Sequence, residues 1–284
     1  MSKFLRQNSS ITFRYDNEIA ILKPSIYDLQ MLKDIASVRS VKIIPILTDN
    51  YVFIILNPLK TEAIVVDPGT SAEVIEYLKK NEISVNAILL THHHDDHIGG
   101  ALEIKSSFNA PVYAPLKNKF QIEFADHFVT EGDQLNIGSF QFKVIELPGH
   151  TLGHVAYWEK NERWLFSGDV LFGLGCGRLF EGTATQMYQS LEKIKQLPEK
   201  TKVFCTHEYT ETNLKFCHKL FSEFVPPVVS FDQLKKYETE LALVRGQKLP
   251  SVPLQLDIEK VVNPFLVSKD LEQFTSLRQS RNKF

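Results

Sequence analysis

The sequence of 284 residues has few of the features that mark a secreted, membrane-spanning or nucleic-acid-binding protein. It contains three cysteines, and no apolar run approaches the length of a helix that spans a bilayer. An odd cysteine count without a secretory signal segment favours a reducing compartment. The net charge of −2 gives no support to a general nucleic-acid-binding surface. These absences favour a monomeric globular protein of the cytoplasm, with no nucleic-acid partner and no membrane partner.

The first forty residues form an extension whose role the sequence leaves open. Residues 1–15 contain Lys3, Arg6 and Arg14, and no acidic residue precedes Asp16. This composition is weakly typical of a transit peptide, and a tail without regular structure is the alternative. If residues 1–40 include a transit peptide, the mitochondrial matrix replaces the cytoplasm as the expected location.

The rest of the chain divides into a mixed α/β body over residues 41–209 and a smaller, mostly helical unit over residues 210–284. In the body, short apolar segments rich in β-branched residues predict strands, and Ser71 is predicted to cap a helix. In the smaller unit, the spacing of apolar residues predicts helices. The predicted strands are 41–47, 51–56, 63–66, 85–90, 140–147, 154–158, 164–166 and 203–205; the predicted helices are 72–80, 183–197, 214–224, 234–244 and 270–283.

Residues 91–100 hold four of the nine histidines in the sequence Thr-His-His-His-Asp-Asp-His-Ile-Gly-Gly, directly after a predicted strand. Side chains two residues apart in an extended loop leave from the same side, so His92 and His94 can converge. A helix predicted to begin near the two glycines turns Asp96 and His97 toward a second point. The pattern favours a two-metal site over a solvated loop.

Three further segments place a candidate metal ligand just after an apolar strand. They carry His150, Asp169 and His207, in the sequences Leu-Pro-Gly-His, Phe-Ser-Gly-Asp and Cys-Thr-His-Glu-Tyr. Loops at strand ends let ligands converge while the sheet below stays rigid. His154 lies in the first of these segments, and we expect it to support the site and not to bind metal.

The order of these residues resembles the metallo-β-lactamase superfamily. Within it, four motifs are similar to glyoxalase II, the hydroxyacylglutathione hydrolases: Gly-Asp-Val-Leu-Phe (168–172), Gly-Cys-Gly-Arg (175–178), Phe-Glu-Gly-Thr (180–183) and Thr-His-Glu-Tyr-Thr (206–210). Residues 48–51 and 263–265 also fit, so the resemblance covers residues 41–284. It implies a four-layer αββα sandwich of two sheets between helices, followed by a small helical domain that binds substrate.

The resemblance also implies a ligand set for two divalent metal ions. One ion is held by His92, His94 and His150, the second by Asp96, His97 and His207, and Asp169 bridges them. Imidazole and carboxylate ligands without thiolate suit zinc, which we expect first, with iron or manganese as alternatives. Two such ions lower the pKa of a bridging water toward neutrality, and Asp96 is expected to orient the resulting hydroxide.

The implied reaction is hydrolysis of S-D-lactoylglutathione to D-lactate and glutathione in methylglyoxal detoxification. By the same resemblance, four residues bind the glutathione part: Arg178, Tyr209, Arg278 and Arg281. Three positions depart from the family pattern. Phe180 lacks the hydroxyl of a common tyrosine, Asp95 adds a negative charge beside the site, and Val267 replaces a common arginine.

Three alternatives to this function remain open from the sequence. They are a persulfide dioxygenase with one iron, another hydrolase of the superfamily acting on lactones, β-lactams or nucleic acid, and a non-catalytic metal-binding protein. The long helical end of the chain and the full second metal set favour the thioester hydrolase over the persulfide dioxygenase. The intact set of seven ligands favours it over a non-catalytic protein.

Overall fold

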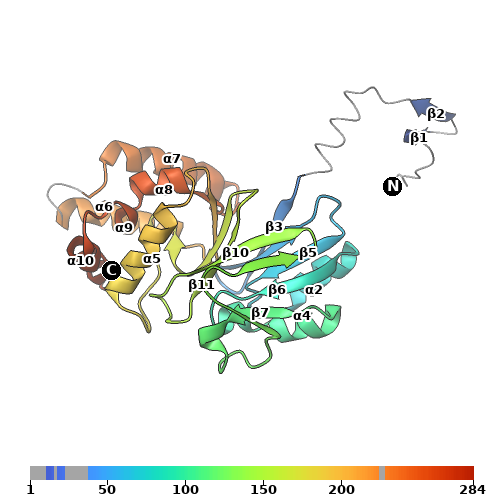
Figure 1. Cartoon of the computed structure of the whole chain (residues 1–284). Helices are drawn as coiled ribbons and strands as arrows, with labels where there is room; N and C mark the ends of the chain where they lie inside the picture. The colour runs from blue at the N-terminus through green and yellow to red at the C-terminus, as the bar shows by residue number, and fades with distance from the viewer. Residues whose placement is uncertain (1–10, 16–17, 23–37, 224–227) are drawn as a thin grey trace.

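Two six-stranded β-sheets packed face to face form the body of the molecule (Figure 1). The structure, a computed structural model, describes residues 11–15, 18–22, 38–223 and 228–284. Figure 1 shows α2 and α4 against the sheet that contains β5, β6 and β7, and α6 to α10 gathered around α5 at the opposite side. The expected four-layer metallo-β-lactamase sandwich with a C-terminal helical domain is confirmed.

The first sheet has the strand order β3-β4-β5-β6-β7-β8. Pairing is antiparallel from β3 to β5 and parallel from β5 to β8, so the carboxyl ends of β5 and β6 lie at one edge. Its strands are β3 (Ser40–Ile46), β4 (Asn50–Leu56), β5 (Glu62–Val66), β6 (Ser84–Leu89), β7 (Val112–Pro115) and β8 (His127–Val129).

The second sheet has the order β16-β15-β12-β11-β10-β9, and only β12 and β15 pair in parallel. Its strands are β9 (Gln134–Ile137), β10 (Phe140–Glu146), β11 (Val155–Glu159), β12 (Trp164–Gly168), β15 (Lys202–Cys205) and β16 (Leu254–Gln255). A small separate hairpin pairs β13 (Leu171–Phe172) with β14 (Gly175–Cys176). The helical unit therefore contributes an edge strand, β16, to the sheet of the body.

The helices fall into two groups along the chain. The body contains α2 (Ala72–Lys80), α3 (Asp95–Ile98), α4 (Ala101–Phe108), the 3-10 turn η1 (Leu116–Asn118) and α5 (Ala184–Lys195). The C-terminal unit contains α6 (Thr210–Glu223), α7 (Phe231–Gly246), α8 (Leu256–Val262), α9 (Pro264–Val267) and α10 (Leu271–Asn282). Among the described residues, no helix is long and apolar enough to cross a membrane.

Burial on both faces explains why the central strands are apolar without alternation. Every residue of β4 is buried. Because side chains along a strand point to opposite faces in turn, Phe53 and Ile55 enter the core between the two sheets. Val52 and Ile54 instead pack in a second core with Val74 of α2. A strand covered by a sheet on one side and helices on the other reads as a continuous hydrophobic run.

The structure corrects one local prediction and confirms another. Ser71 occupies the N-cap position of α2, but its hydroxyl donates to Glu103 and makes no capping bond, so α2 is tied to α4 instead. A helix was expected to begin near Gly99 and Gly100, and α4 does begin at Ala101, with Gly100 at its N-cap position. The short helix α3, which precedes the two glycines, was not predicted. A Cβ on Gly99 would lie 2.7 Å from the carbonyl oxygen of Gly69. Close packing of two loops therefore requires glycine at position 99, just before the start of α4.

The N-terminal extension lies largely outside the described residues, since 1–10, 16–17 and 23–37 are not among them. The described part pairs β1 (Ile11–Tyr15) with β2 (Glu18–Leu22) as an antiparallel hairpin. That hairpin was not predicted from the sequence. Phe224, the last apolar position of one predicted helix, also falls outside the described residues.

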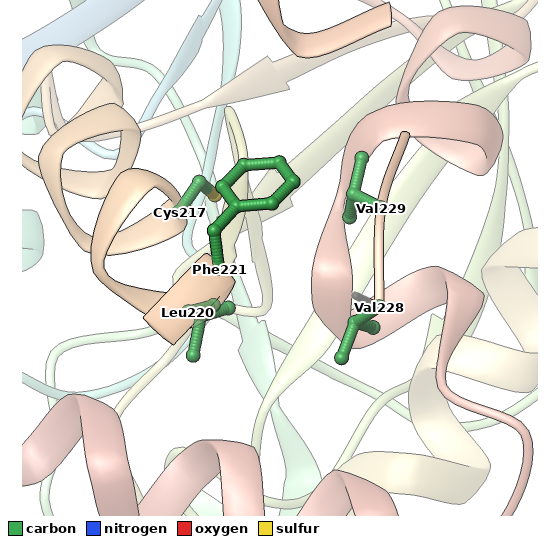
Figure 2. A pocket seen from close by; sticks show the side chains of 5 residues that line it. All are labelled: Cys217, Leu220, Phe221, Val228 and Val229. Atoms are coloured by element: carbon green, nitrogen blue, oxygen red, sulfur yellow. The ribbon is translucent and has the colours of Figure 1, made fainter. Parts of the chain in front are cut away.

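The helical unit has a small core of its own. Leu174 of the body packs there with Cys217, Val229, Leu234 and Val262. Figure 2 shows a small apolar pocket at this core, where Leu220 and Phe221 of α6 face residues 228–229. Its lining is aliphatic and aromatic apart from the thiol of Cys217. We interpret the pocket as imperfect packing between α6 and the segment before α7.

Glu259 of α8 is a fully buried carboxyl in this unit. Its oxygens accept hydrogen bonds from the hydroxyl of Tyr237 (2.8 Å), the amide of Asn263 (3.0 Å) and the backbone N–H of Leu174 (2.9 Å). Burial outweighs these bonds and raises the pKa of Glu259 to about 7. The protonated side chain therefore suits the fold better than the carboxylate.

This shift predicts a pH dependence of stability. Because the folded pKa lies above the unfolded one, the contribution of Glu259 is complete below the unfolded pKa of 4.5 and is lost as pH rises through about 7. We expect Glu259→Gln to remove a pH-dependent penalty on the order of 3 kcal/mol above pH 7. Urea unfolding of both proteins between pH 5 and 8 measures it, with the exposed neighbour Glu240→Gln as control. Parallel curves for wild type and Glu259→Gln would contradict the assignment.

Candidate metal centre

The predicted ligands gather where strands of both sheets end. His92, His94 and His97 follow β6, His150 follows β10, Asp169 follows β12 and His207 follows β15. Backbone bonds close the edge between the sheets: the N–H of Tyr51 donates to Thr206 (2.7 Å), and that of Val155 donates to Thr91 (2.9 Å). An isolated bridge also pairs Asn50 with His207. Each ligand thus stands on backbone that is fixed by a neighbouring strand.

Three imidazoles converge on one point. Nδ1 of His94 lies 3.0 Å from Nε2 of His92 and 3.1 Å from Nε2 of His150. Two of the three remaining ring nitrogens are held from behind, because Nδ1 of His92 faces the hydroxyl of Thr91 (3.1 Å) and Nδ1 of His150 faces the carbonyl of Arg178 (2.8 Å). Donation to these oxygens leaves each Nε2 unprotonated and aimed at the common point.

A second set lies beside the first. Nε2 of His207 is 3.3 Å from Oδ2 of Asp96, and Nε2 of His97 is 3.6 Å from the same oxygen. Asp169 stands between the sets: its Oδ2 lies 3.3 Å from Nε2 of both His150 and His207, and its Oδ1 lies 3.4 Å from Nε2 of His97. The structure therefore brings all seven sequence-predicted ligands together, with one carboxylate facing both groups.

The residues present fit a bound cation. Their donor atoms form three groups, each within 4.8 Å: His92, His94 and His150; His92, His97 and Asp169; and Asp96, His97 and His207. Among the described residues, Nε2 of His97 and Oδ1 of Asp169 are buried without a hydrogen-bond partner. Buried polar atoms are normally satisfied, so orphaned atoms that face one another indicate a missing partner. A divalent ion would supply it.

Asp67, at the end of β5, is a supporting residue that sequence reasoning missed. Its carboxylate accepts from the backbone N–H (2.8 Å) and hydroxyl (2.7 Å) of Thr91, and Nδ1 of His97 lies 3.1 Å away. Asp67 has φ of +48°, a left-handed conformation that is uncommon outside glycine. The signal available in the sequence was an Asp-Pro-Gly turn after an apolar strand.

Asp49 and Asn50 support the opposite side of the centre. Oδ1 of Asp49 lies 2.8 Å from Nδ1 of His207, and the amide of Asn50 donates to Oδ2 of Asp96 at 2.8 Å. The motif that contains them was noticed in the sequence, but no role was given to either residue. Carboxylates behind ligating imidazoles fix the tautomer and raise ligand basicity.

The electrostatics divide the imidazoles into two kinds. Burial lowers the pKa of His92 well below its ordinary value and also lowers those of His94 and His150. Burial acts the same way on His97 and His207, but Asp169 and the other carboxylates outweigh it and raise their pKa values to about 10 and about 11. A bound cation would compete with protons for these two rings, so its affinity should fall as pH falls.

His154 does not belong to the ligand groups. Its Nε2 accepts from the backbone N–H of Asp169 (3.1 Å), and its ring stacks on His92 with centroids 4.8 Å apart. Gly168, with φ of +50°, leaves room for this contact, because a Cβ there would lie 2.7 Å from Nε2 of His154. The expectation that His154 supports the site and does not ligate agrees with this geometry.

The predicted substrate-binding residues lie around the same centre but differ in exposure. Arg178 is exposed, with its guanidinium 5.8 Å from the ring centroid of Phe180. Arg278 is buried and donates to the carbonyl of Cys176 at 2.8 Å. Burial lowers the pKa of Arg281, and so do Arg278 and Arg178, which places the three cations near one another. The ring of Tyr209 stacks on His207 at 4.8 Å.

Phe180 and Asp95, two of the departures from the family pattern, are both exposed. The Phe180 ring stands edge-on to His94 and His150, with centroids 5.6 and 5.2 Å apart. It therefore contributes an apolar edge to the first metal-ligand group. Val267, the third departure, ends α9 and packs against the small core of the helical unit.

The sandwich with a histidine- and aspartate-rich centre at its sheet edge defines a protein of the metallo-β-lactamase superfamily, whose family model matches residues 47–207. The model for the hydroxyacylglutathione hydrolase C-terminus matches residues 208–284. A hydroxyacylglutathione hydrolase of Bdellovibrio bacteriovorus is 53% identical over 249 residues, which are 87% of this chain and 99% of that protein. The chain belongs to the hydroxyacylglutathione hydrolase family.

More distant relatives support the same family or the same fold. A hydroxyacylglutathione hydrolase of Vibrio campbellii is 41% identical, covering 86% of this chain and 99% of that protein. The crystal structure of ETHE1 from Myxococcus xanthus superposes with a TM-score of 0.63, covering 86% of this chain and 91% of that one. At 23% identity it shows the fold alone. The BLEG-1 B3 metallo-β-lactamase is 36% identical with a TM-score of 0.55, but it covers only 59% of this chain.

The role of Asp67 can be tested by Asp67→Asn. The amide keeps the size but withdraws the carboxylate that faces Nδ1 of His97, so we expect metal affinity to fall about 10- to 100-fold. Chelator competition on the purified protein measures this affinity. Asp95→Asn, an exposed position on α3, is the matched control and should bind metal as wild type does. Equal affinities in the two variants would disprove the role of Asp67.

Proposed function

We propose that this chain hydrolyses S-D-lactoylglutathione to D-lactate and glutathione with two divalent metal ions. Membership of the hydroxyacylglutathione hydrolases carries the thioester hydrolase activity, and the observation that supports the binuclear site is Asp169, whose two oxygens face both ligand groups. We further propose that the protein acts as a monomer in the cytoplasm, where its three buried cysteines stay free thiols.

The donor set suits zinc, with iron and manganese as alternatives. His92, His94 and His150 would hold one ion, Asp96, His97 and His207 the other, and Asp169 both. When bound, such a pair lowers the pKa of a water toward neutrality and favours negative charge on the substrate. The protein's own part is to orient these rings. The Nδ1–H groups of His92, His150, His97 and His207 donate to Thr91, the carbonyl of Arg178, Asp67 and Asp49, so that each Nε2 would face a bound ion.

Asp96 is the candidate for orienting the attacking water. It is partly exposed, unlike the buried Asp169, so one side of its carboxylate can reach solvent or substrate. His207 and His97 hold the pKa of Asp96 well below its usual range against the effect of burial, and Asn50 donates to the same oxygen. An ionised carboxylate can accept the hydrogen bond of a nucleophilic water and fix its direction toward the thioester carbonyl.

Substrate recognition is proposed to rest on Arg178, Tyr209, Arg278 and Arg281. Glutathione carries carboxylates, and guanidinium groups bind carboxylates through paired, charge-assisted hydrogen bonds. Arg178 is the exposed member and so the one free to meet a ligand directly. Arg278 already spends hydrogen bonds on the carbonyl of Cys176 and on Asn282, and it shapes the loop before Arg178.

The decisive assay joins metal analysis with hydrolysis of S-D-lactoylglutathione. We expect about two metal ions per chain and release of free thiol, with both reduced in Asp169→Ala because neither ligand group keeps its shared carboxylate. A single bound iron, with oxygen uptake on glutathione persulfide and no thioester cleavage, would establish the persulfide dioxygenase instead. Full metal content in Asp169→Ala would refute the bridging role.

Arg178→Ala tests the substrate side separately. Loss of a charge-assisted hydrogen bond to a carboxylate costs about 1.5–3 kcal/mol, so we expect KM for the glutathione thioester to rise about 10- to 100-fold. Metal content and the thermal midpoint should stay as in wild type, since the Arg178 side chain is exposed. Lys79→Ala, an exposed cation on α2, serves as control. An unchanged KM in Arg178→Ala would remove that residue from the binding site.

A further inference from the structure

The carboxylate of Glu208 lies next to the metal centre without belonging to it. Its side chain is only 8% exposed. Oε2 accepts from the hydroxyl of Tyr51 (2.7 Å) and the backbone N–H of Ser251 (2.8 Å), and Oε1 accepts from the hydroxyl of Ser251 (2.7 Å). The guanidinium of Arg245 stands 3.2 Å from Oε2. Such a set of donors compensates the cost of burying a carboxylate.

These partners come from two different parts of the chain. Tyr51 belongs to β4 of the body. Arg245 lies in the last turn of α7 and Ser251 precedes β16, both in the helical unit. The hydroxyl of Ser251 also lies 2.7 Å from that of Thr210, at the start of α6. Glu208 is thus a point where residues 245–251 of the helical unit attach to the body through a buried charge.

The backbone of Glu208 leads directly to a metal ligand. Its N–H donates to the carbonyl of Asp49 at 2.8 Å, and the carboxylate of Asp49 faces Nδ1 of His207 at the same distance. Two residues before Glu208, the carbonyl of Thr206 accepts from the N–H of Tyr51. Residues 206–208 are therefore held on one side by the loop that orients His207 and on the other by the helical unit.

We propose that Glu208 is a positioning residue that couples the seating of residues 245–251 to the orientation of His207 by Asp49. A displacement of the helical unit must pull on the Glu208 side chain, and the backbone bond to Asp49 passes the strain to the imidazole of His207. The substrate-binding unit and the second metal-ligand group are in this way one mechanical unit. The inference rests on the proposed role of His207 as a ligand.

Glu208→Gln tests the coupling with a side chain of the same size and no charge. We expect affinity for one of the two metal ions to fall about tenfold, as is usual for residues behind a ligand, and the visible absorption of the Co²⁺-substituted protein to change. kcat should fall more than KM rises. Glu211→Gln is the matched control, because Glu211 pairs with the same Arg245 (3.2 Å) but is 57% exposed and has no bond to the metal loop. It should change metal affinity less than twofold.

Ser251→Ala probes the same coupling from the helical unit, and it serves if Glu208→Gln fails to fold. This change removes one hydroxyl from a residue that is remote in sequence from every proposed metal ligand. We expect affinity for the same metal ion to fall, but by less than in Glu208→Gln. The double variant should lose no more affinity than Glu208→Gln alone, because residues that act through one network are not additive.

Two results would overturn the inference. One is a lower thermal midpoint in Glu208→Gln with metal affinity, Co²⁺ absorption and kcat unchanged, which would make Glu208 a structural tie only. The other is full additivity of Glu208→Gln and Ser251→Ala in metal affinity. Failure of the wild type to cleave S-D-lactoylglutathione, with the metal shift still present, would instead count against the proposed function and leave the coupling intact.

Discussion

The buried carboxylate of Asp67 is the interaction on which the centre depends. One side chain fixes the start of the loop after β6 through Thr91 and the ring of His97 through Nδ1. It does so from the end of β5, the strand that pairs in parallel with β6. The position of the first histidine loop is thereby set by sheet register and not by the loop itself. Because the carboxylate is buried, removing its hydrogen-bond donors would leave an unpaired charge. Asp67 therefore holds Thr91 and His97 in place, and these donors in turn stabilise Asp67.

Bringing several buried imidazoles together is unfavourable in free energy, and the rest of the fold must compensate for it. Three ring nitrogens with lone pairs approach within about the length of a hydrogen bond around His94, and burial discourages their protonation. Only a cation relieves that arrangement fully. The core between the sheets holds the loops in place meanwhile, because β4, β6, β12 and β15 bury their apolar side chains directly beneath them. Because the core is closely packed, the loops have little room to move, so the geometry of the ligands is set before a metal binds.

The sequence was enough to predict the sandwich, its main strands and the seven converging side chains. His92, His94, Asp96 and His97 were recognisable because their spacing is local and follows an apolar strand. Asp67 was not, since a single carboxylate after a strand reads as an ordinary turn and its partners lie 24 to 30 residues away. The same limit applies to β16, whose two residues carry no periodicity and pair with β15 only through the tertiary fold. Exposure of the arginines also depends on packing: Arg178 and Arg278 look alike in sequence and differ completely in burial.

The helical unit completes the centre because it holds the loop that joins Asp169 to Arg178. The amide of Asn263 donates to the carbonyls of Phe172 (3.0 Å) and Gly175 (3.1 Å), which caps both strands of the β13–β14 hairpin. Asn213 donates to the carbonyl of Gly173 and Glu259 accepts from the N–H of Leu174, so four backbone groups of this hairpin find partners in the helical unit. Without these bonds the segment between a shared metal ligand and an exposed cation would carry unsatisfied backbone groups. The unit that supplies Arg278 and Arg281 therefore also fixes the hairpin that follows Asp169, the carboxylate that faces both ligand groups.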